Sequence, residues 1–277
     1  MKRRRTVVVG ATSGMGDALA RGLADDPDRD LILVGRDPDR ATALATQLRS
    51  ATVLALDVAT YAGAQALISA VQERWDRVDV LVNNAGVMTR VRRETADGME
   101  LNLAVHHLAP FWITTGLAEQ LRKSRGRVVN VNSAGHAAPM EGHGPVELDF
   151  NDLHSRRDFD PFMAYSRSKL ANLLFTYELA RREPHILATA LHPGVVRTRL
   201  GREFPRWQVA LIHATALSPR QGAGAIQALV EREDIPTASY FDRLHQSRSS
   251  AASYRAADAA RLWEHTNDIT ARLKATR

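Results

Sequence analysis

The chain has 277 residues, of which 44% are hydrophobic, and no cysteine. This is enough for one buried core, and the lack of cysteine excludes disulfides and cysteine-based metal sites or nucleophiles. The net charge of +6 is spread along the chain, so we expect no nucleic-acid partner. No run of 18 apolar residues occurs, and the short apolar run after residues 2–5 stops at Gly10. We therefore predict no membrane span, no signal peptide and a cytoplasmic location.

Short β-branched runs alternate with longer helical patterns along the chain. The runs predict strands at 6–10, 30–35, 52–56, 78–83, 126–133, 186–192 and 238–242. The periodic segments predict helices at 14–26, 38–49, 60–75, 97–123, 162–182, 219–233 and 256–273. This alternation predicts one α/β domain over residues 1–277, a doubly wound parallel sheet with helices on both faces.

Glycines follow the first predicted strand. Gly10, Gly14 and Gly16 lie in "GATSGMG", where the next helix begins. Glycine lets the backbone turn tightly and approach a pyrophosphate, whose charge a helix N-terminus favours. The spacing favours a dinucleotide site, and a tight turn without a ligand is the alternative.

The end of the second predicted strand bears on the choice of nucleotide. Gly35 stands where an acidic side chain would bind the ribose 2′-hydroxyl of NAD, and Arg36 follows. A guanidinium matches phosphate geometry, so we predict NADP(H) as the cofactor in preference to NAD(H). Asp37 is either a competing acid or the N-cap of the next helix.

Tyr165 and Lys169 begin an apolar-periodic stretch and should share one helix face, one turn apart. A phenol with a pKa near 10 is poorly matched to neutral pH, and a neighbouring cation should lower that pKa. The pair therefore predicts a general acid and base. In isolation, the simpler interpretation is a surface tyrosine beside a solvated lysine, and the other motifs of the chain must decide.

Two stretches, 136–161 and 197–218, fit no regular element and are expected near the substrate site. His136, His143 and His154 of the first stretch lack metal-ligand spacing, so we predict no metal site and treat them as solvated, with substrate contact as the alternative. An apolar set could form the pocket wall for a lipophilic or aromatic substrate, or a lid that packs on the core. It comprises Phe159, Phe162, Met163, Phe204, Trp207 and Leu211.

Together with "NNAG" (83–86), Ser133 and "HPGVVRT" (192–198), these motifs have the order and spacing of one family. The chain resembles the short-chain dehydrogenase/reductase family over nearly its whole length, and within it the retinol-dehydrogenase-like branch. The resemblance implies a Rossmann-like fold and NAD(P)-dependent interconversion of a small ketone or aldehyde and its alcohol. It also implies a homo-oligomer formed through the long central helices.

The resemblance implies a role for each matched residue. Ser133 would donate to the substrate oxygen, Tyr165 would exchange the proton, and Lys169 would also bind the nicotinamide ribose. The implied cofactor-binding set is Gly10, Thr12, Ser13, Gly14, Met15, Gly16, Arg36, Asp57, Val58, Asn84, Ala85, Gly86, Tyr165, Lys169, Pro193, Gly194, Val196 and Thr198.

The sequence departs from the family pattern at one candidate catalytic position. His106 stands where most members have an asparagine that helps to hold a water linking the lysine to solvent. In one interpretation, His106 keeps that water through its backbone carbonyl and the enzyme is an ordinary reductase. In the other, the imidazole alters the proton relay and supports non-redox dehydration, cyclisation or epimerisation. A regulator that binds nucleotide without catalysis is a third hypothesis, and the intact Ser133, Tyr165 and Lys169 argue against it.

Overall fold

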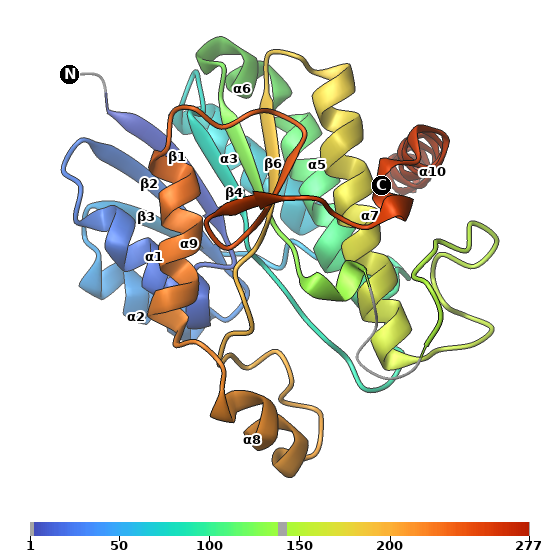
Figure 1. The fold of residues 1–277 in the computed structure, drawn as a ribbon. Helices are drawn as coiled ribbons and strands as arrows, with labels where there is room; N and C mark the ends of the chain where they lie inside the picture. The colour runs from blue at the N-terminus through green and yellow to red at the C-terminus, as the bar shows by residue number, and fades with distance from the viewer. Residues whose placement is uncertain (1–2, 138–142, 277) are drawn as a thin grey trace.

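The computed structural model describes residues 3–137 and 143–276, and it confirms the α/β architecture (Figure 1). Eight strands form one sheet in the order β3-β2-β1-β4-β5-β6-β7-β8, parallel except for the last pair. From β1 the sheet is extended on one side by β2 and β3 and on the other side by β4 and the later strands. Doubly wound folds bind ligands at this switch in strand order, between β1 and β4. The strands are β1 Arg4–Val9, β2 Arg29–Gly35, β3 Ala51–Ala55, β4 Val80–Asn83, β5 Arg127–Val131, β6 Leu187–His192, β7 Ser239–Asp242 and β8 His245–Ser247.

Helices cover both faces because successive strand residues point to opposite sides. Val8 and Leu33 pack with the helices α1 (Gly14–Ala24), α2 (Pro38–Gln47) and α9 (Pro219–Glu231). Val7 and Ile32 pack in the opposite cluster, which includes residues of α3 (Tyr61–Arg74), α5 (Ala109–Gly116) and α7 (Pro161–Arg182). The continuous apolar runs of β1 and β2 are thus buried on both faces, as in parallel sheets generally.

The predicted helix at 97–123 is wrong as a single element. It begins with α4 (Leu101–Leu103), passes through a π-helical turn η1 (Ala104–Leu108) into α5, and restarts as α6 (Ala118–Ser124). Pro110 has no N–H, so the carbonyl of His106, four residues earlier, loses its α-helical donor. The π turn accommodates that loss.

Two shorter elements also differ from the prediction. The 197–218 segment contains a helix, α8 (Arg206–Ala214), and β8 forms an antiparallel edge that the sequence did not indicate. Within 136–161, the described part has a 3₁₀ turn, η2 (Ala134–His136), and is otherwise irregular up to α7. Residues 138–142 of that loop lie outside the described residues.

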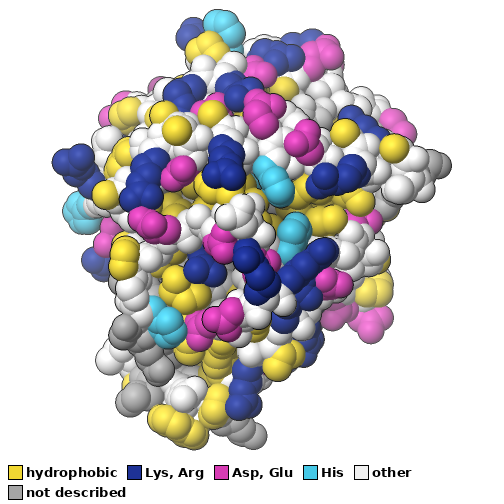
Figure 2. All heavy atoms as spheres, turned by 90° about the vertical axis from the view of Figure 1, so that its right-hand side faces the viewer, with side chains coloured by type: hydrophobic (Ala, Val, Ile, Leu, Met, Phe, Trp, Pro, Cys, Tyr) yellow, Lys and Arg dark blue, Asp and Glu magenta, His cyan; other side chains and the backbone are white. Residues whose placement is uncertain are grey.

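The last helix, α10 (Ala256–Ala275), follows a short 3₁₀ turn, η3 (Ala251–Tyr254), and packs on the outer side of α5 and α7 (Figure 1). The Trp263 ring lies 4.8 Å from that of Phe111, and Trp112 Nε1 donates to Thr270 Oγ1 at 2.9 Å. Basic and acidic side chains are interspersed over the face that carries α10 (Figure 2). The α10 helix therefore covers part of the outer side of the long central helices.

Candidate active site

The glycine loop turns sharply from β1 into α1. Gly10 and Gly14 have positive φ values of 83° and 56°, which side-chain-bearing residues rarely adopt. A Cβ on Gly16 would lie 1.8 Å from the Gly10 carbonyl oxygen, so a side chain there would force the loop open. Ser13 precedes α1, and its side chain makes no cap hydrogen bond to that helix. The first N–H groups of α1 and the Ser13 hydroxyl are therefore available to an anion.

At the end of β2, the position that would carry an acid for NAD is closed to any side chain. A Cβ on Gly35 would lie 2.1 Å from Thr12 Oγ1. Asp37 accepts from the backbone N–H groups of Asp39 and Arg40, which makes it the N-cap of α2. Arg36 is exposed and has no hydrogen bond or ion pair within the described part of the chain. Its guanidinium is free to bind a phosphate.

The segment after β4 supports the glycine loop from the other side. Asn84 Nδ2 donates to the Gly10 carbonyl at 2.9 Å, whereas the buried Asn84 Oδ1 has no partner among the described residues. After β3, Asp57 accepts from Ala59 N–H at 3.2 Å, and Val58 is buried. These residues line the same cleft as the glycine loop.

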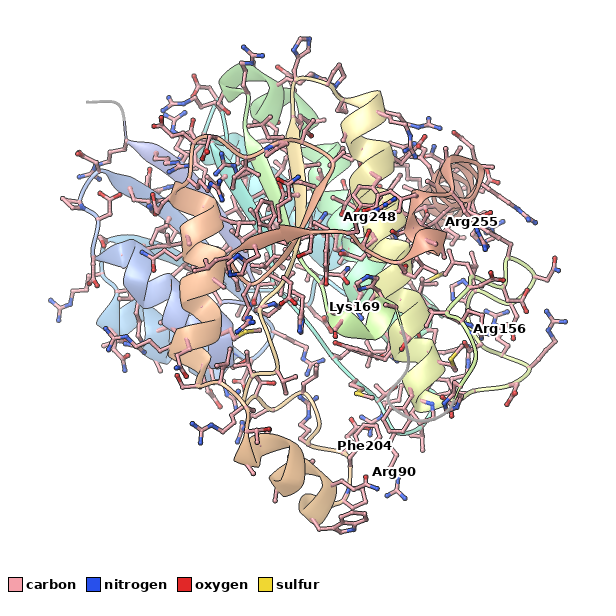
Figure 3. The ribbon with its side chains drawn as sticks, viewed as in Figure 1. Arg90, Arg156, Lys169, Phe204, Arg248 and Arg255 are labelled. Atoms are coloured by element: carbon pink, nitrogen blue, oxygen red, sulfur yellow. The ribbon has the colours of Figure 1, made fainter. Side chains whose placement is uncertain are left out.

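Ser133 follows β5, and Tyr165 and Lys169 lie one turn apart on α7, as predicted. Lys169 is labelled beside α7 in Figure 3. Its Nζ lies 5.8 Å from the centre of the Tyr165 ring and donates to the Val131 carbonyl at 2.9 Å. Ser133 Oγ accepts from Gly135 N–H at 3.1 Å, which leaves its hydrogen available to donate. The fold therefore brings together the three side chains that the sequence singled out.

The electrostatics of this group differ from the expectation. Burial raises the pKa of Tyr165, and a hydrogen bond with Ser133 lowers it in part. Burial also lowers the pKa of Lys169 from 10.5 to about 7. The expected lowering of the Tyr165 pKa by Lys169 is not seen in the protein alone, because desolvation penalises both charged forms.

His106 and Asn132 lie behind this group. His106 is 1% exposed, its imidazole lies 5.5 Å from the Tyr165 ring at 90°, and burial and the charge of Lys169 lower its pKa well below 6.5. Asn132 donates to the Lys169 carbonyl at 2.9 Å and accepts from Ser133 N–H at 2.8 Å. Through these backbone bonds, Asn132 links the end of β5 to α7.

A cleft of about 450 Å³ joins these parts, running from the glycine loop and Arg36 to Tyr165 and Lys169. Thr198 lines the cleft close to Gly14. Pro193, Gly194 and Val196 lie between the end of β6 and Thr198. Several predicted residues shape the site without lining the cleft: Thr12, Gly16, His106, Ser133, Pro193, Gly194 and Val196. Thr12 and Gly16 act through their close contacts with Gly35 and Gly10.

The sequence analysis missed three arginines of the cleft wall: Arg40, Arg199 and Arg202. Arg40 lies four residues after Arg36, one helical turn into α2, and its guanidinium pairs with Asp37 at 3.3 Å. Arg199 and Arg202 lie in the 197–218 stretch that was expected near the substrate site, but the sequence did not single them out as cleft residues.

The loop histidines are not uniformly solvated. His136 is 3% exposed, donates from Nδ1 toward the Ser133 carbonyl at 2.5 Å and accepts from Ser250 N–H at 3.1 Å, so the expectation of a solvated residue is wrong for it. His143 lies 3.4 Å from Asp160, and His154 accepts from Glu100 N–H at 3.3 Å. His136 therefore ties the residue after β5 to the C-terminal part of the chain.

The candidate substrate wall is partly assembled. Phe204, labelled in Figure 3, belongs to the segment before α8. Its ring lies 5.5 Å from that of Phe162 on α7, so the pair joins the two segments. Trp207 is 69% exposed and points away from the core, and the side chain of Leu211 is not among those described. Of the apolar set, the Phe162–Phe204 pair is best placed to border a substrate.

Comparisons of the sequence with known proteins point to one family. The short chain dehydrogenase family model matches residues 4–144. Human retinol dehydrogenase 11 is 33% identical over 95% of this chain and 84% of that protein. A Streptomyces protein named "Putative daunorubicin C-13 ketoreductase" is 32% identical over 94% of this chain and 90% of its own length.

Solved structures of similar chains share the fold. A Mycobacterium paratuberculosis protein superposes with a TM-score of 0.77 at 29% identity, covering 96% of this chain and 93% of its own. A short-chain dehydrogenase from Sphingobium yanoikuyae in complex with NADPH has a TM-score of 0.67 at 25% identity and covers 93% of both chains. Among the described residues of our chain, no helix is both long and apolar enough to traverse a lipid bilayer.

Proposed function

The chain belongs to the short-chain dehydrogenase family, and we propose that it is an NADP(H)-dependent oxidoreductase that interconverts a ketone or aldehyde and the corresponding alcohol. One observation carries the proposal. A single cleft connects the glycine loop and Arg36 with Tyr165 and Lys169. A dinucleotide bound at the glycine loop would thus reach the side chains that exchange a proton.

The residues present fit a phosphorylated dinucleotide. Gly10 and Gly16 leave no room for a side chain, and the N–H groups at the start of α1 can bind the pyrophosphate. Within residues 3–137 and 143–276, Arg36 has no partner. Arg36 would hold the 2′-phosphate, and Arg40 would add a weaker contact because it is shared with Asp37. NADPH supplies a hydride to the carbonyl carbon when bound.

The chain's own groups supply the proton. As the hydride arrives, Tyr165 donates its phenolic proton to the carbonyl oxygen, and Ser133 donates a hydrogen bond to the same oxygen. Burial raises the pKa of Tyr165, which keeps the phenol protonated at neutral pH and suits reduction. Alcohol oxidation needs the phenolate, so it should be favoured at higher pH.

The relatives support a lipophilic or aromatic carbonyl as the substrate class. One is named a retinol dehydrogenase and another a putative daunorubicin C-13 ketoreductase. The Phe162–Phe204 pair would supply aromatic surface for such a substrate, since it joins α7 to the segment before α8. A cytoplasmic location and a homo-oligomer stay predictions.

Non-redox chemistry through His106 is the weaker alternative. It needs an imidazole that titrates or moves a proton, whereas burial and Lys169 lower the pKa of His106 well below 6.5. A regulator without catalysis is also disfavoured, because Ser133, Tyr165 and Lys169 lie together.

The proposal is tested by titrating the protein with NADPH and with NADH and monitoring binding by tryptophan and nicotinamide fluorescence. We expect NADPH to bind at least tenfold more tightly, and Arg36→Ala to remove most of that preference while leaving NADH binding unchanged. Arg49→Ala is the matched control, since Arg49 is exposed just beyond α2 and does not line the cleft. Failure of both nucleotides to bind, or of NADPH to be consumed with a panel of aromatic ketones, would overturn the proposal.

A further inference from the structure

His106 lies in the π turn η1 with every polar atom of its side chain and its carbonyl engaged. Because Pro110 has no N–H to offer, the His106 carbonyl accepts instead from Asn172 Nδ2 on α7 at 2.8 Å. Its imidazole Nε2 accepts from Val87 N–H at 3.1 Å, and its Nδ1 lies 2.8 Å from Ser168 Oγ. One residue thus bridges the chain after β4, the central helix and α7.

The partners decide which ring nitrogen carries the hydrogen. Ser168 Oγ donates its single hydrogen to the Tyr165 carbonyl at 2.6 Å, so it can only accept from His106. Val87 N–H is a donor, so Nε2 must be the acceptor. The neutral imidazole with hydrogen on Nδ1 is the form that satisfies every bond.

Protonation would break this arrangement. A hydrogen on Nε2 would face the N–H of Val87 and leave two donors opposed in a buried site. The titratable groups that face the ring are Tyr165 and Lys169, both on α7, and a charge on Lys169 further disfavours an imidazolium. The site therefore holds the ring neutral.

The ring's contacts lie on two parts of the proposed active site. Val87 is the last residue of the cleft-lining segment 84–87, in which Asn84 supports the glycine loop. The His106 ring meets the Tyr165 ring edge to face, which restricts rotation of the phenol. We propose that His106 is a positioning residue that holds the segment 84–87 and the Tyr165 ring in place as a neutral imidazole and exchanges no proton during turnover. This inference deepens the proposed function and rests on it.

The tautomer can be tested without any turnover. In ¹⁵N-imidazole NMR of the wild-type protein, with the His106 signals assigned by their loss in His106→Gln, we expect hydrogen on Nδ1 and no titration from about pH 5.5 to 8.5. Titration within that range, or hydrogen on Nε2, would overturn the inference. This result does not depend on cofactor or substrate, so it stands even if the proposed function fails.

Two substitutions separate the two imidazole bonds. A glutamine amide reaches about as far as Nε2 and can still accept from Val87 N–H, whereas an asparagine amide reaches only as far as Nδ1 and can still donate to Ser168. We expect His106→Gln to keep NADPH affinity within about threefold and His106→Asn to weaken it about tenfold. Both should lower kcat about tenfold through the lost contact with the Tyr165 ring, with the pH profile of kcat unchanged.

His107→Gln is the matched control. His107 is equally buried, but it bonds to Thr266 on α10 and its ring meets those of Phe111 and Phe175 rather than Tyr165. We expect it to lower Tm without changing NADPH affinity or kcat in the folded protein. A pH profile displaced in either His106 variant, or equal NADPH affinities for His106→Gln and His106→Asn, would contradict the positioning role. If the wild type binds no NADPH, the proposed function fails, and the NMR result alone decides the state of His106.

Discussion

The ammonium of Lys169 lies 5.8 Å from the centre of the Tyr165 ring and donates one hydrogen bond, to the carbonyl of Val131. Its other two hydrogens have no acceptor within residues 3–137 and 143–276. A buried ammonium with unused donors costs folding free energy. In the proposed enzyme those donors would bind ribose hydroxyls of the cofactor, so the same feature that weakens the fold would serve binding.

Replacing Lys169 should therefore stabilise the protein and abolish its activity. The folded-state pKa of about 7 lies below the unfolded value of 10.5, so the unfolded chain binds more protons between these values. The resulting penalty is fully present below about pH 7 and disappears as the pH rises through 10.5. We expect Lys169→Met to gain about 2–4 kcal/mol of unfolding free energy in urea at about pH 6.5 and much less at about pH 10.

Lys274→Met is the control for the lost charge, since Lys274 is exposed near the end of α10. It should leave the unfolding free energy within about 0.5 kcal/mol at both pH values. Equal or lower stability of Lys169→Met at the lower pH would mean that the buried ammonium is not a burden to the fold.

Gly35 and Thr12 should be energetically coupled. A Cβ at position 35 would overlap the Thr12 side chain, so Gly35→Ala should cost about 1–3 kcal/mol and weaken NADPH and NADH by similar factors. Arg36→Ala, in contrast, should affect only NADPH. The double variant Thr12→Gly/Gly35→Ala relieves the overlap. Urea unfolding of the wild type, Thr12→Gly, Gly35→Ala and the double variant should give a favourable coupling free energy of at least about 1 kcal/mol. Additive losses would show that the loop moves aside at no cost.

Buried neutral histidines should make the fold sensitive to acid. Burial lowers the pKa of His107 to about 3 and that of His154 to about 4. Both folded-state values lie below the ordinary value of 6.5, so the unfolded chain binds more protons once the pH falls below it, and stability decreases in that direction. We expect His107→Gln to reduce this slope by about 1 kcal/mol per pH unit between about pH 6 and 5.

Unfolding curves measured at several pH values give that slope directly. His245→Gln serves as the comparison, because His245 is exposed on β8. If His107→Gln and His245→Gln have the same slope as the wild type, the acid sensitivity arises elsewhere, and the buried pair of His107 and Thr266 does not resist protonation.

The sequence by itself determined the strand–helix order, the glycine loop and the pairing of Tyr165 with Lys169. These depend on local periodicity and on short spacings, which a single sequence displays directly. For Asp37 the sequence offered two roles, and the structure selected the N-cap. Where the prediction failed locally, as in the helix at 97–123, the cause was a competing local rule, because Pro110 removes a backbone donor.

Only the tertiary structure decided how distant residues act on one another. The neutral state of His106 depends on Val87 and Ser168, the closed position at Gly35 depends on Thr12, and α10 covers α5 and α7 from the far end of the chain. None of these contacts produces a periodic pattern in the sequence, because each one joins segments that are far apart in the chain and are brought together by packing. For the same reason the raised pKa of Tyr165 could not be foreseen, since desolvation depends on everything that surrounds the phenol.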